Sequence, residues 1–366
     1  MKKRVLSALL CVAMVATMLI GCGSNEAATE ETKATESTEA TEETVVVKLG
    51  IAPGSGQVLS AIAEDKGFYA EEGIEVENVV ISSADEALAS LVAGKVDVES
   101  TYGTYLPLQY VAAEENITII SGYMLTGAMA IVAQLGTEFN GAESFIGATL
   151  ATAGGLGMHQ ITGPIMDAGG DPNTDVTWLN LGSAPDRIEA VRSGEAEYAI
   201  LPTGYASVAE EAGLEVMAYS SDIFPEYSCC RTMANADWVA ENPETVQKLI
   251  KCWIRALQVF KADREYAVSL TAEQLDLEED YVAAYMLDEH FQLQVDPAYK
   301  IVKRAWDIDK QVGAFDTDDA VLDEHFNHEL YKAALDECVE QYYDEDPTFY
   351  DECLTYYDEN NVNITE

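Results

Sequence analysis

A glycine-rich turn in the middle of the chain combines residues of a type and spacing that can hold a polar ligand. The segment from Phe145 to Gly170 has the pattern of a short apolar strand, a turn from Thr152 to Gly157 with three glycines, and a helix. Glycine has no Cβ and tolerates positive φ, so the backbone N–H groups of this turn can lie open at the helix start. Together with the helix dipole, such donors favour an anionic or carbonyl-bearing ligand.

Two known phosphate-binding motifs do not fit this turn. Its glycines lack the G-x-G-x-x-G spacing of a dinucleotide fold, and the Gly-Lys-Ser/Thr ending of a P-loop is absent. A tight strand-to-helix turn without a ligand is therefore an equal alternative from this segment alone, and the elements around it must decide.

The first 44 residues have the composition of an export signal followed by a tether. A basic start precedes a short apolar run, which ends at Cys22 in the sequence Leu-Ile-Gly-Cys and is typical of a signal peptide over residues 1–22. This ending resembles the lipobox of bacterial lipoproteins, which implies that Cys22 carries lipid and anchors the chain to the extracytoplasmic face of the cell membrane. An uncleaved anchor helix is the alternative. Residues 23–44, rich in Glu, Ala, Thr and Ser, are expected to form a disordered tether.

The charge and the cysteines limit the possible partners. The formal net charge of −45 repels nucleic acid and anionic lipid, so we exclude both as binding partners. Five cysteines follow Cys22, an odd number, so at least one has no intramolecular partner. Cys338 and Cys353 flank a proline-containing turn and can either pair across a helical hairpin or remain buried thiols.

From Val45 onward, strands alternate with helices, which predicts α/β lobes with mostly parallel sheets. One set of alternating elements starts at Val45 and a second near Ala128. After Pro225 the pattern becomes helical, and Asn242 followed by Pro243 predicts a helix start. That helix is expected to reach about Ala262, with further helices at Glu278–His290, Pro297–Val312, Glu329–Tyr343 and Pro347–Tyr357. We expect lobe 1 to comprise residues 45–126 and 225–366, and lobe 2 residues 127–224.

Five short motifs, in this order and spacing, resemble a known protein family. They are Lys66–Tyr69, Glu72–Val76, Ala93–Val98, Gly169–Pro172 and Ala190–Ala199. The family is that of the extracytoplasmic substrate-binding proteins of ABC importers in the sulfonate, nitrate and taurine group, also called SsuA/THI5-like or NMT1-like. The resemblance implies the type II periplasmic-binding-protein fold, in which two Rossmann-like lobes joined at a hinge close around a ligand. It also implies two partners, a small-molecule ligand and an ABC-transporter permease.

In this fold the ligand site is expected in the loops at the carboxyl ends of the strands. Hydroxyls, glycine backbone N–H groups and tyrosine rings in these loops, together with one arginine, are the candidate ligand-binding groups. The candidates are Ser55, Gly56, Gln57, Thr101, Tyr102 and Thr104 in lobe 1, Gly154, Gly155, Met158, His159, Thr203 and Tyr205 in lobe 2, and Tyr227 and Arg231 near the hinge. We prefer Arg231 to Arg187 as a charge partner, because Arg187 lies inside a predicted helix where a surface salt bridge is the ordinary role.

Three other functions are alternatives to this one. The family also resembles pyrimidine synthases with a cysteine-rich run, but Cys229 and Cys230 stand without a flanking histidine in an exported chain, so we expect no catalysis and no cofactor. The pair His325 and His328 amid carboxylates offers a metal site as an alternative, although the expected role is a solvated surface, and we assign no metal ligand. A structural lipoprotein is the third. Few basic residues in the cleft loops argue against a bare inorganic anion, and the tyrosines favour an organic or heteroaromatic ligand.

Overall fold

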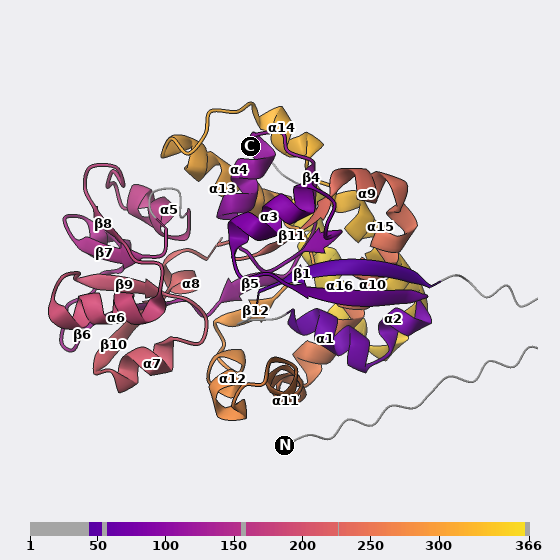
Figure 1. Ribbon diagram of the computed structural model, residues 1–366, viewed down its shortest axis with the longest axis horizontal. Helices are drawn as coiled ribbons and strands as arrows, with labels where there is room; N and C mark the ends of the chain where they lie inside the picture. The colour runs from indigo at the N-terminus through magenta and orange to yellow at the C-terminus, as the bar shows by residue number, and fades with distance from the viewer. Residues whose placement is uncertain (1–43, 53–56, 155–158, 226, 363–366) are drawn as a thin grey trace, which may run out of the picture. The chain divides into compact units, whose positions relative to one another are not determined.

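The computed structural model describes residues 44–52, 57–154, 159–225 and 227–362 (Figure 1). Residues 43–366 form one compact unit, which contains both main sheets and the five hydrophobic clusters of the core. The predicted signal peptide, the lipid anchor at Cys22 and nearly all of the tether lie outside the described residues. Across the described ranges, every helix is too short or too polar to cross a membrane.

The first sheet belongs to lobe 1 and has five strands. Their order is β2 (Ile74–Val80), β1 (Val45–Ile51), β3 (Val98–Glu99), β11 (Arg231–Asn235) and β4 (Ile117–Gly122). Strand β1 runs parallel to β2 and β3, whereas β11 is antiparallel to β3 and β4. The sheet therefore mixes directions, because β11 returns to lobe 1 from lobe 2, with 108 residues between the end of β4 and the start of β11.

Side chains alternate between the two faces of this sheet. Ala234 joins one hydrophobic cluster and its neighbour Met233 joins another, as expected for successive residues of a strand. The first cluster is covered by α1 (Val58–Asp65), α2 (Phe68–Glu71), α10 (Pro243–Ala262), α15 (His328–Tyr342) and α16 (Pro347–Tyr357). The second is covered by α3 (Ala84–Val92), α4 (Tyr105–Ala112), α13 (Tyr299–Gln311) and α14 (Asp319–Glu324).

The second sheet belongs to lobe 2. Its order is β10 (Leu214–Tyr219), β6 (Ala130–Gln134), β9 (Tyr198–Leu201), β7 (Thr149–Thr152) and β8 (Thr177–Asn180). Strand β7 is parallel to β8 and β9, and β6 is antiparallel to β9 and β10. Its helices are α5 (His159–Asp167), α6 (Ala184–Ser193), α7 (Ala206–Glu211) and α8 (Ser220–Ile223).

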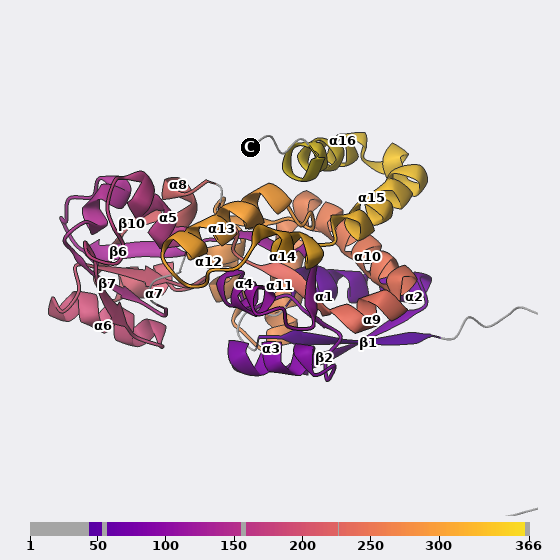
Figure 2. The same cartoon turned by 90° about the horizontal axis from the view of Figure 1, so that it is seen from above.

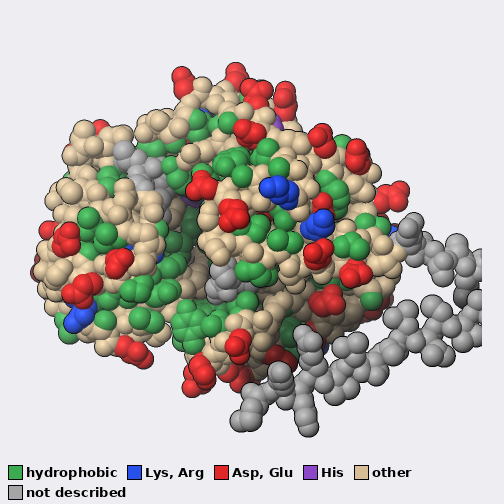
Figure 3. All heavy atoms as spheres, in the orientation of Figure 1, with side chains coloured by type: hydrophobic (Ala, Val, Ile, Leu, Met, Phe, Trp, Pro, Cys, Tyr) green, Lys and Arg blue, Asp and Glu red, His purple; other side chains and the backbone are tan. Residues whose placement is uncertain are grey.

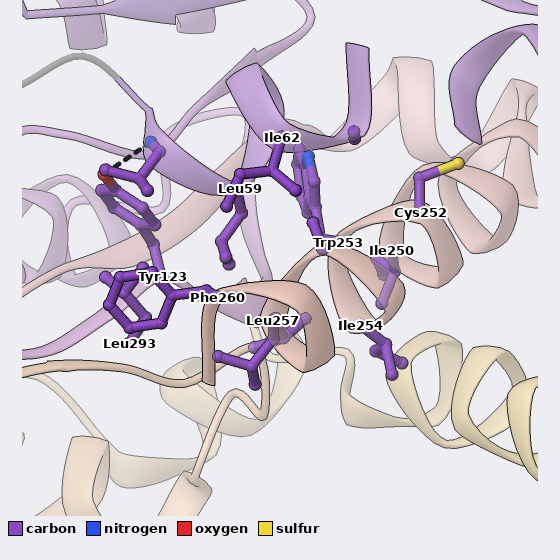
Figure 4. Close-up of a cluster of buried hydrophobic side chains, with 14 of the residues drawn as sticks. Leu59, Ile62, Tyr123, Ile250, Cys252, Trp253, Ile254, Leu257, Phe260 and Leu293 are labelled. Carbon is purple, nitrogen blue, oxygen red and sulfur yellow. Dashed lines mark hydrogen bonds between the residues drawn. The ribbon is translucent and has the colours of Figure 1, made fainter. Parts of the chain in front are cut away.

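Helix α10 is the central element of the lobe 1 core. It begins at Pro243 and ends at Ala262, as the sequence predicts. Figure 4 shows Trp253 of this helix beside Ile62 of α1 and close to Leu59, and all three belong to one hydrophobic cluster. The indole Nε1–H of Trp253 donates to the hydroxyl of Tyr69 at 2.7 Å, so the buried polar atom of the largest core side chain is paired. Helices α15 and α16 continue this layer beside α10 (Figure 2).

A small third sheet was not predicted. The helix expected over Glu278–His290 ends earlier, as α12 (Glu279–Met286), and the chain then forms β12 (Phe291–Leu293), which is antiparallel to β5 (Met124–Gly127). The helix stops because the Asp288 carboxylate accepts the backbone N–H of His290 at 2.8 Å in a tight turn. Between α10 and α12 lies α11 (Arg264–Leu275), and α9 (Ala236–Glu241) precedes α10.

Acidic side chains are spread over the face of the molecule in Figure 3, with few basic ones among them. The chain has 65 Asp and Glu against 20 Lys and Arg.

Candidate ligand-binding site

The loop that follows β3 is fixed by one buried carboxylate, Glu99. Its Oε1 accepts hydrogen bonds from the Thr101 hydroxyl at 3.0 Å and from the Tyr102 backbone N–H at 3.1 Å. The Thr101 hydroxyl in turn accepts the N–H of Ala52 at 2.9 Å, which joins this loop to the end of β1. The Tyr102 hydroxyl donates to the carbonyl oxygen of Ile81. Thr101 and Tyr102 thus have protein partners that hold the two loops together.

The second carboxylate oxygen of Glu99, Oε2, differs from the first because it is unpaired among the described residues. Glu99 is fully buried, and its Oε2 has no hydrogen-bond partner within the part of the chain that the structure describes. Burial raises the pKa of this carboxyl to about 7, although the hydrogen bonds from Thr101 and Tyr102 oppose the shift. Sequence reasoning missed Glu99, and the available signal was a charged residue that ends an otherwise buried strand.

The loop after β3 is also joined to the segment that returns from lobe 2. The Thr104 hydroxyl lies 3.1 Å from the Ser228 hydroxyl and donates to the carbonyl oxygen of Cys229 at 3.2 Å. On the other side, Nε2 of His159, the first residue of α5, lies 3.2 Å from the carbonyl oxygen of Ser228. Thr104, His159 and Ser228 therefore meet, and they bring the end of β3 together with the start of α5.

His159 is neutral in this environment. Burial lowers its pKa to about 4; the nearby Arg231 charge acts in the same direction, and the hydrogen bond to Ser228 opposes them. A carbonyl oxygen only accepts, so Nε2 carries the proton and Nδ1 is left as an acceptor. That Nδ1 is buried and has no partner among the described residues.

Gln57 supplies a third unpaired group. It is the N-cap of α1, where its Oε1 accepts the N–H of Ser60 at 2.6 Å. Its Nε2 is buried and lacks a partner in the described ranges. The next residue, Val58, donates its N–H to the Tyr123 hydroxyl at 3.1 Å, which fixes the start of the helix beside β5.

Three further candidate residues differ in the contacts that they make: Thr203, Tyr205 and Tyr227. The Thr203 hydroxyl donates to the carbonyl oxygen of Gly127 at the end of β5, so it joins lobe 2 to the crossing segment. Tyr227 is buried, its hydroxyl contacts the Met129 sulfur at 3.2 Å, and its ring lies 5.8 Å from that of His159. Tyr205 is the N-cap residue of α7 and packs against the lobe 2 core. The structure thus places Tyr227 beside His159 and packs Tyr205 against the lobe 2 core.

Arg231 is fully buried, and its surroundings are acidic. It pairs in register with Gly122, so its side chain points to the face of the sheet where a Cβ on Gly122 would collide with the backbone of residues 294–296. Nη1 donates to the carbonyl oxygen of Cys230 at 2.9 Å, while Nε and Nη2 have no hydrogen-bond partner in the described part of the chain. Burial lowers the pKa of Arg231, and the charge of Asp296 opposes this. Arg231 therefore lies between the hinge and the C-terminal helices.

Arg187 is not on the surface, so the surface salt bridge expected for it is wrong. Its guanidinium is buried in lobe 2, where Nη1 donates to the backbone carbonyl oxygen of Ile200 at 2.6 Å. Burial lowers its pKa. Helix α6 can hold Arg187 in this buried position, because the aliphatic stem of the side chain packs beneath the sheet and the guanidinium donates to a strand carbonyl oxygen.

Several predicted groups are outside the described residues or lack the predicted chemistry. Ser55, Gly56, Gly155 and Met158 fall outside the described ranges, and Gly154 is present as a carbonyl acceptor for the Thr152 hydroxyl.

The possible metal ligands are engaged elsewhere. His325 Nδ1 lies 2.7 Å from the Ile117 carbonyl oxygen and His328 Nδ1 lies 2.7 Å from the Tyr357 hydroxyl. No group of three potential metal ligands occurs among the described residues. The five described cysteines are free thiols, so Cys338 and Cys353 are buried thiols rather than a disulfide.

Two cavities of about 520 Å³ each lie away from these loops. One is lined largely by α16, including Asp351 and Tyr356, and the other by residues of α9, the start of α10 and the segment 324–330. Neither contains a predicted ligand residue, and the unpaired groups at the strand ends offer the more specific chemistry.

The fold agrees with that of known binding proteins. The periplasmic aliphatic sulphonate binding protein SsuA of Escherichia coli has a TM-score of 0.65 at 16% identity, covering 79% of this chain and 99% of SsuA. The periplasmic nitrate-binding protein NrtA of Synechocystis PCC 6803 has a TM-score of 0.67 at 15% identity, covering 88% and 99%. The desulfurization enzyme DSZB matches with a TM-score of 0.58 at 13% identity, covering 80% and 99%. These likenesses show the type II periplasmic-binding-protein fold, with two Rossmann-like lobes, and the fold alone.

Sequence comparison identifies the family. The Bacillus subtilis (strain 168) protein YtlA is 25% identical over 203 residues, which cover 54% of this chain and 60% of YtlA, so the match spans less than two thirds of that relative. The sequence model of the family described as NMT1/THI5 like matches residues 59–267, which is more than half of the chain and contains both sheets except β1. The chain therefore belongs to the NMT1/THI5-like family.

Proposed function

We propose that this chain is an extracytoplasmic solute-binding lipoprotein that captures a small organic molecule and delivers it to the permease of an ABC importer. The proposed ligand is a sulfonate, a taurine-like molecule, a pyrimidine or a related compound. The ligand is held between lobe 1 (residues 45–126 and 225–366) and lobe 2 (residues 127–224). Neighbours that are named for sulfonate and nitrate binding support the transport role, and the lipobox-like Cys22 supports a lipid anchor.

The observation that carries this proposal is a set of three buried, unpaired polar atoms at the strand ends. They are Nε2 of Gln57, Oε2 of Glu99 and Nδ1 of His159, none of which finds a partner among the described residues. Buried polar atoms in proteins are nearly always hydrogen-bonded, and leaving one unpaired costs about 1–3 kcal/mol. Their position at the ends of β1 and β3 and the start of α5 is where this fold binds its ligand.

The chemistry of the three groups supports an organic ligand. The amide of Gln57 donates, and neutral His159 accepts through Nδ1. Glu99, with a pKa of about 7, accepts when ionised and also donates when protonated. A bare oxyanion has only acceptors, so it would leave Nδ1 of His159 unpaired and would be repelled by the ionised form of Glu99. A ligand with both donors and acceptors can satisfy all three.

We also propose that the protein is not an enzyme. A nucleophile needs a base within hydrogen-bond reach, and the histidine among the candidate residues is His159. Its Nε2 is engaged by the backbone carbonyl oxygen of Ser228. The lowered pKa keeps it a weak base.

A thermal-shift screen of the 43–366 unit tests the binding role. The compounds are alkanesulfonates, taurine, aminopyrimidines, riboflavin, amino acids, nitrate and sulfate. A ligand at about 100 times its Kd should stabilise the fold by about 2.7 kcal/mol. We expect a clear rise in melting temperature with one organic class. A shift with nitrate or sulfate only would refute the organic ligand, and no shift with any compound would argue against the binding role.

Variants locate the site once a compound binds. Glu99→Gln and His159→Phe should each lower its affinity by tenfold or more, because one ligand hydrogen bond is lost in a buried site, at a cost of about 1.5–3 kcal/mol. Thr271→Val is the matched control, since it also removes a buried polar atom that has no partner among the described residues, but this atom is a hydroxyl in α11. Equal losses in the control and the site variants would contradict the placement of the site.

A further inference from the structure

Two adjacent cysteines form an unusual pair at the point where lobe 2 returns to lobe 1. The sulfur atoms of Cys229 and Cys230 lie 3.5 Å apart. Both backbone N–H groups are bonded to the crossing segment, that of Cys229 to the Leu125 carbonyl oxygen at 3.1 Å and that of Cys230 to the Met124 carbonyl oxygen at 2.9 Å. The pair is therefore held in place by β5 and does not depend on a loop conformation.

The surroundings of Cys229 favour its thiolate. The Cys230 thiol hydrogen-bonds to it, and the Tyr227 hydroxyl and the buried Arg231 charge add to the effect, so the pKa of Cys229 falls although burial opposes the shift. The same interaction raises the pKa of Cys230 well above the ordinary value, and burial adds to the rise. One sulfur is thus the nucleophile and its neighbour holds the proton.

Access differs among the described cysteines. Cys229 is only partly buried, whereas Cys252, Cys338 and Cys353 are buried in the lobe 1 core. Burial raises the pKa of all three. Cys230 is also buried, so reaction with a soluble thiol reagent should concentrate on Cys229.

We infer that Cys229 and Cys230 form a redox-active vicinal dithiol, which low-molecular-weight disulfides oxidise to an intramolecular disulfide. The Cys229 thiolate attacks one sulfur of the oxidant, forms a mixed disulfide and releases the first thiol. The Cys230 sulfur, after losing its proton, attacks the Cys229 sulfur, forms the Cys229–Cys230 bond and releases the second thiol. The protein loses two electrons and two protons overall, and the oxidant is reduced to two thiols.

The geometry also predicts that this disulfide is easily reduced. Adjacent Cα atoms are about 3.8 Å apart across a trans peptide, whereas ordinary disulfides join Cα atoms about 4.4–6.8 Å apart. A bond between neighbours is therefore strained, and strained disulfides have more oxidising potentials than structural ones. Oxidation would also move the Cys229 carbonyl oxygen, which holds Thr104, so the redox state acts directly on the candidate ligand site.

The test is intact-mass measurement of the folded, reduced 43–366 unit after exposure to oxidised glutathione without oxygen. We expect a loss of two hydrogens with no bound glutathione, protection of two thiols from alkylation, and full reversal by dithiothreitol. Cys230→Ser should instead keep one glutathione on Cys229, and Cys229→Ser should stay unmodified. Cys338→Ser is the control and should behave as the wild type. Under initial-rate conditions, Cys229 should be alkylated at least about tenfold faster than the buried thiols.

Peptide mapping of the oxidised wild type makes the result independent of how the variants fold. A single peptide with a Cys229–Cys230 disulfide supports the inference. A stable glutathione adduct in the wild type, a fully reduced protein, or a disulfide to Cys252, Cys338 or Cys353 would overturn it.

Discussion

His290 connects the two lobes through a charge that depends on pH. Its Nδ1 lies 2.7 Å from Asp288, and its Nε2 lies 3.0 Å from Asp222 of α8. Tyr219 stacks on the imidazole with the ring centres 4.1 Å apart and donates its hydroxyl to Asp288 at 3.1 Å. Burial alone lowers the pKa of His290, but the hydrogen bond with Asp288 and the charge of Asp222 outweigh it, so the pKa rises above the ordinary 6.5.

The sign and size of the effect follow from these contacts. A base with a raised pKa in the folded state stabilises the fold fully below pH 6.5, and the stabilisation is lost as the pH rises through the raised pKa. The Asp288 contact is the better shielded of the two and should contribute about 1.5 kcal/mol, the lower end for a charge-assisted hydrogen bond. Asp222 is 45% exposed, so its pair should add only about 0.5 kcal/mol. The total is about 2 kcal/mol at acidic pH.

Urea unfolding of the 43–366 unit between about pH 6 and 9 measures this contribution. His290→Gln should be less stable than the wild type by about 2 kcal/mol at the acidic end, and the difference should shrink steadily as the pH rises. His325→Gln is the control, because its imidazole contacts a backbone carbonyl oxygen and no carboxylate partner is seen among the described residues. A difference between wild type and His290→Gln that stays constant over the whole range would refute the reasoning.

Three further predictions concern the lobe contact, the core and the site. Arg304→Ala removes two hydrogen bonds to Asp167, at 2.7 and 2.9 Å, that join α13 to α5. Both side chains are partly exposed, so ligand affinity should fall by less than about fivefold. A double-mutant cycle of Arg304 and Asp167 in which the two single effects simply add would contradict a direct pair. Trp253→Ala should lower the free energy of unfolding of the 43–366 unit by about 3–5 kcal/mol in urea unfolding. Trp253→Phe should lower it by only about 1 kcal/mol for the lost hydrogen bond to Tyr69, plus a small packing loss. Equal effects of the two variants would show that packing is not the main contribution of Trp253 to stability. The pKa of His159 is lowered to about 4, so the stability of the wild type should fall as the pH drops from 6.5 toward 4. His159→Phe should remove this part of the dependence of stability on pH. An unchanged dependence would show that another group titrates in this range.

The alternation of strands and helices could be predicted because period-2 and period-3.6 patterns carry that information locally. The clearest case is α10, where Pro243 fixes the start and a continuous apolar face extends to Phe260. The strand β12 escaped prediction for the same reason. Its three residues are too few to show a period, and its partner β5 lies more than 160 positions earlier in the chain.

The candidate site could be predicted only as a set of loops. The rule for open α/β sheets selected Gln57, Thr104 and His159 as candidates, and the structure connects the latter two through Ser228. The rule could not select Glu99, because Glu99 lies within the strand and its carboxylate turns back to bond the loop that follows. The direction of Arg231, toward the C-terminal helices, likewise depends on the register between β11 and β4.

We propose that a small organic ligand pairs with the unpaired groups of Gln57, Glu99 and His159. A crystal structure of the 43–366 unit with the compound found in the thermal-shift screen tests it most directly. We predict one molecule with its polar atoms within hydrogen-bond distance of Nε2 of Gln57, Oε2 of Glu99 and Nδ1 of His159. A compound bound in the cavity beside α16, with these three atoms still unpaired, would contradict the account.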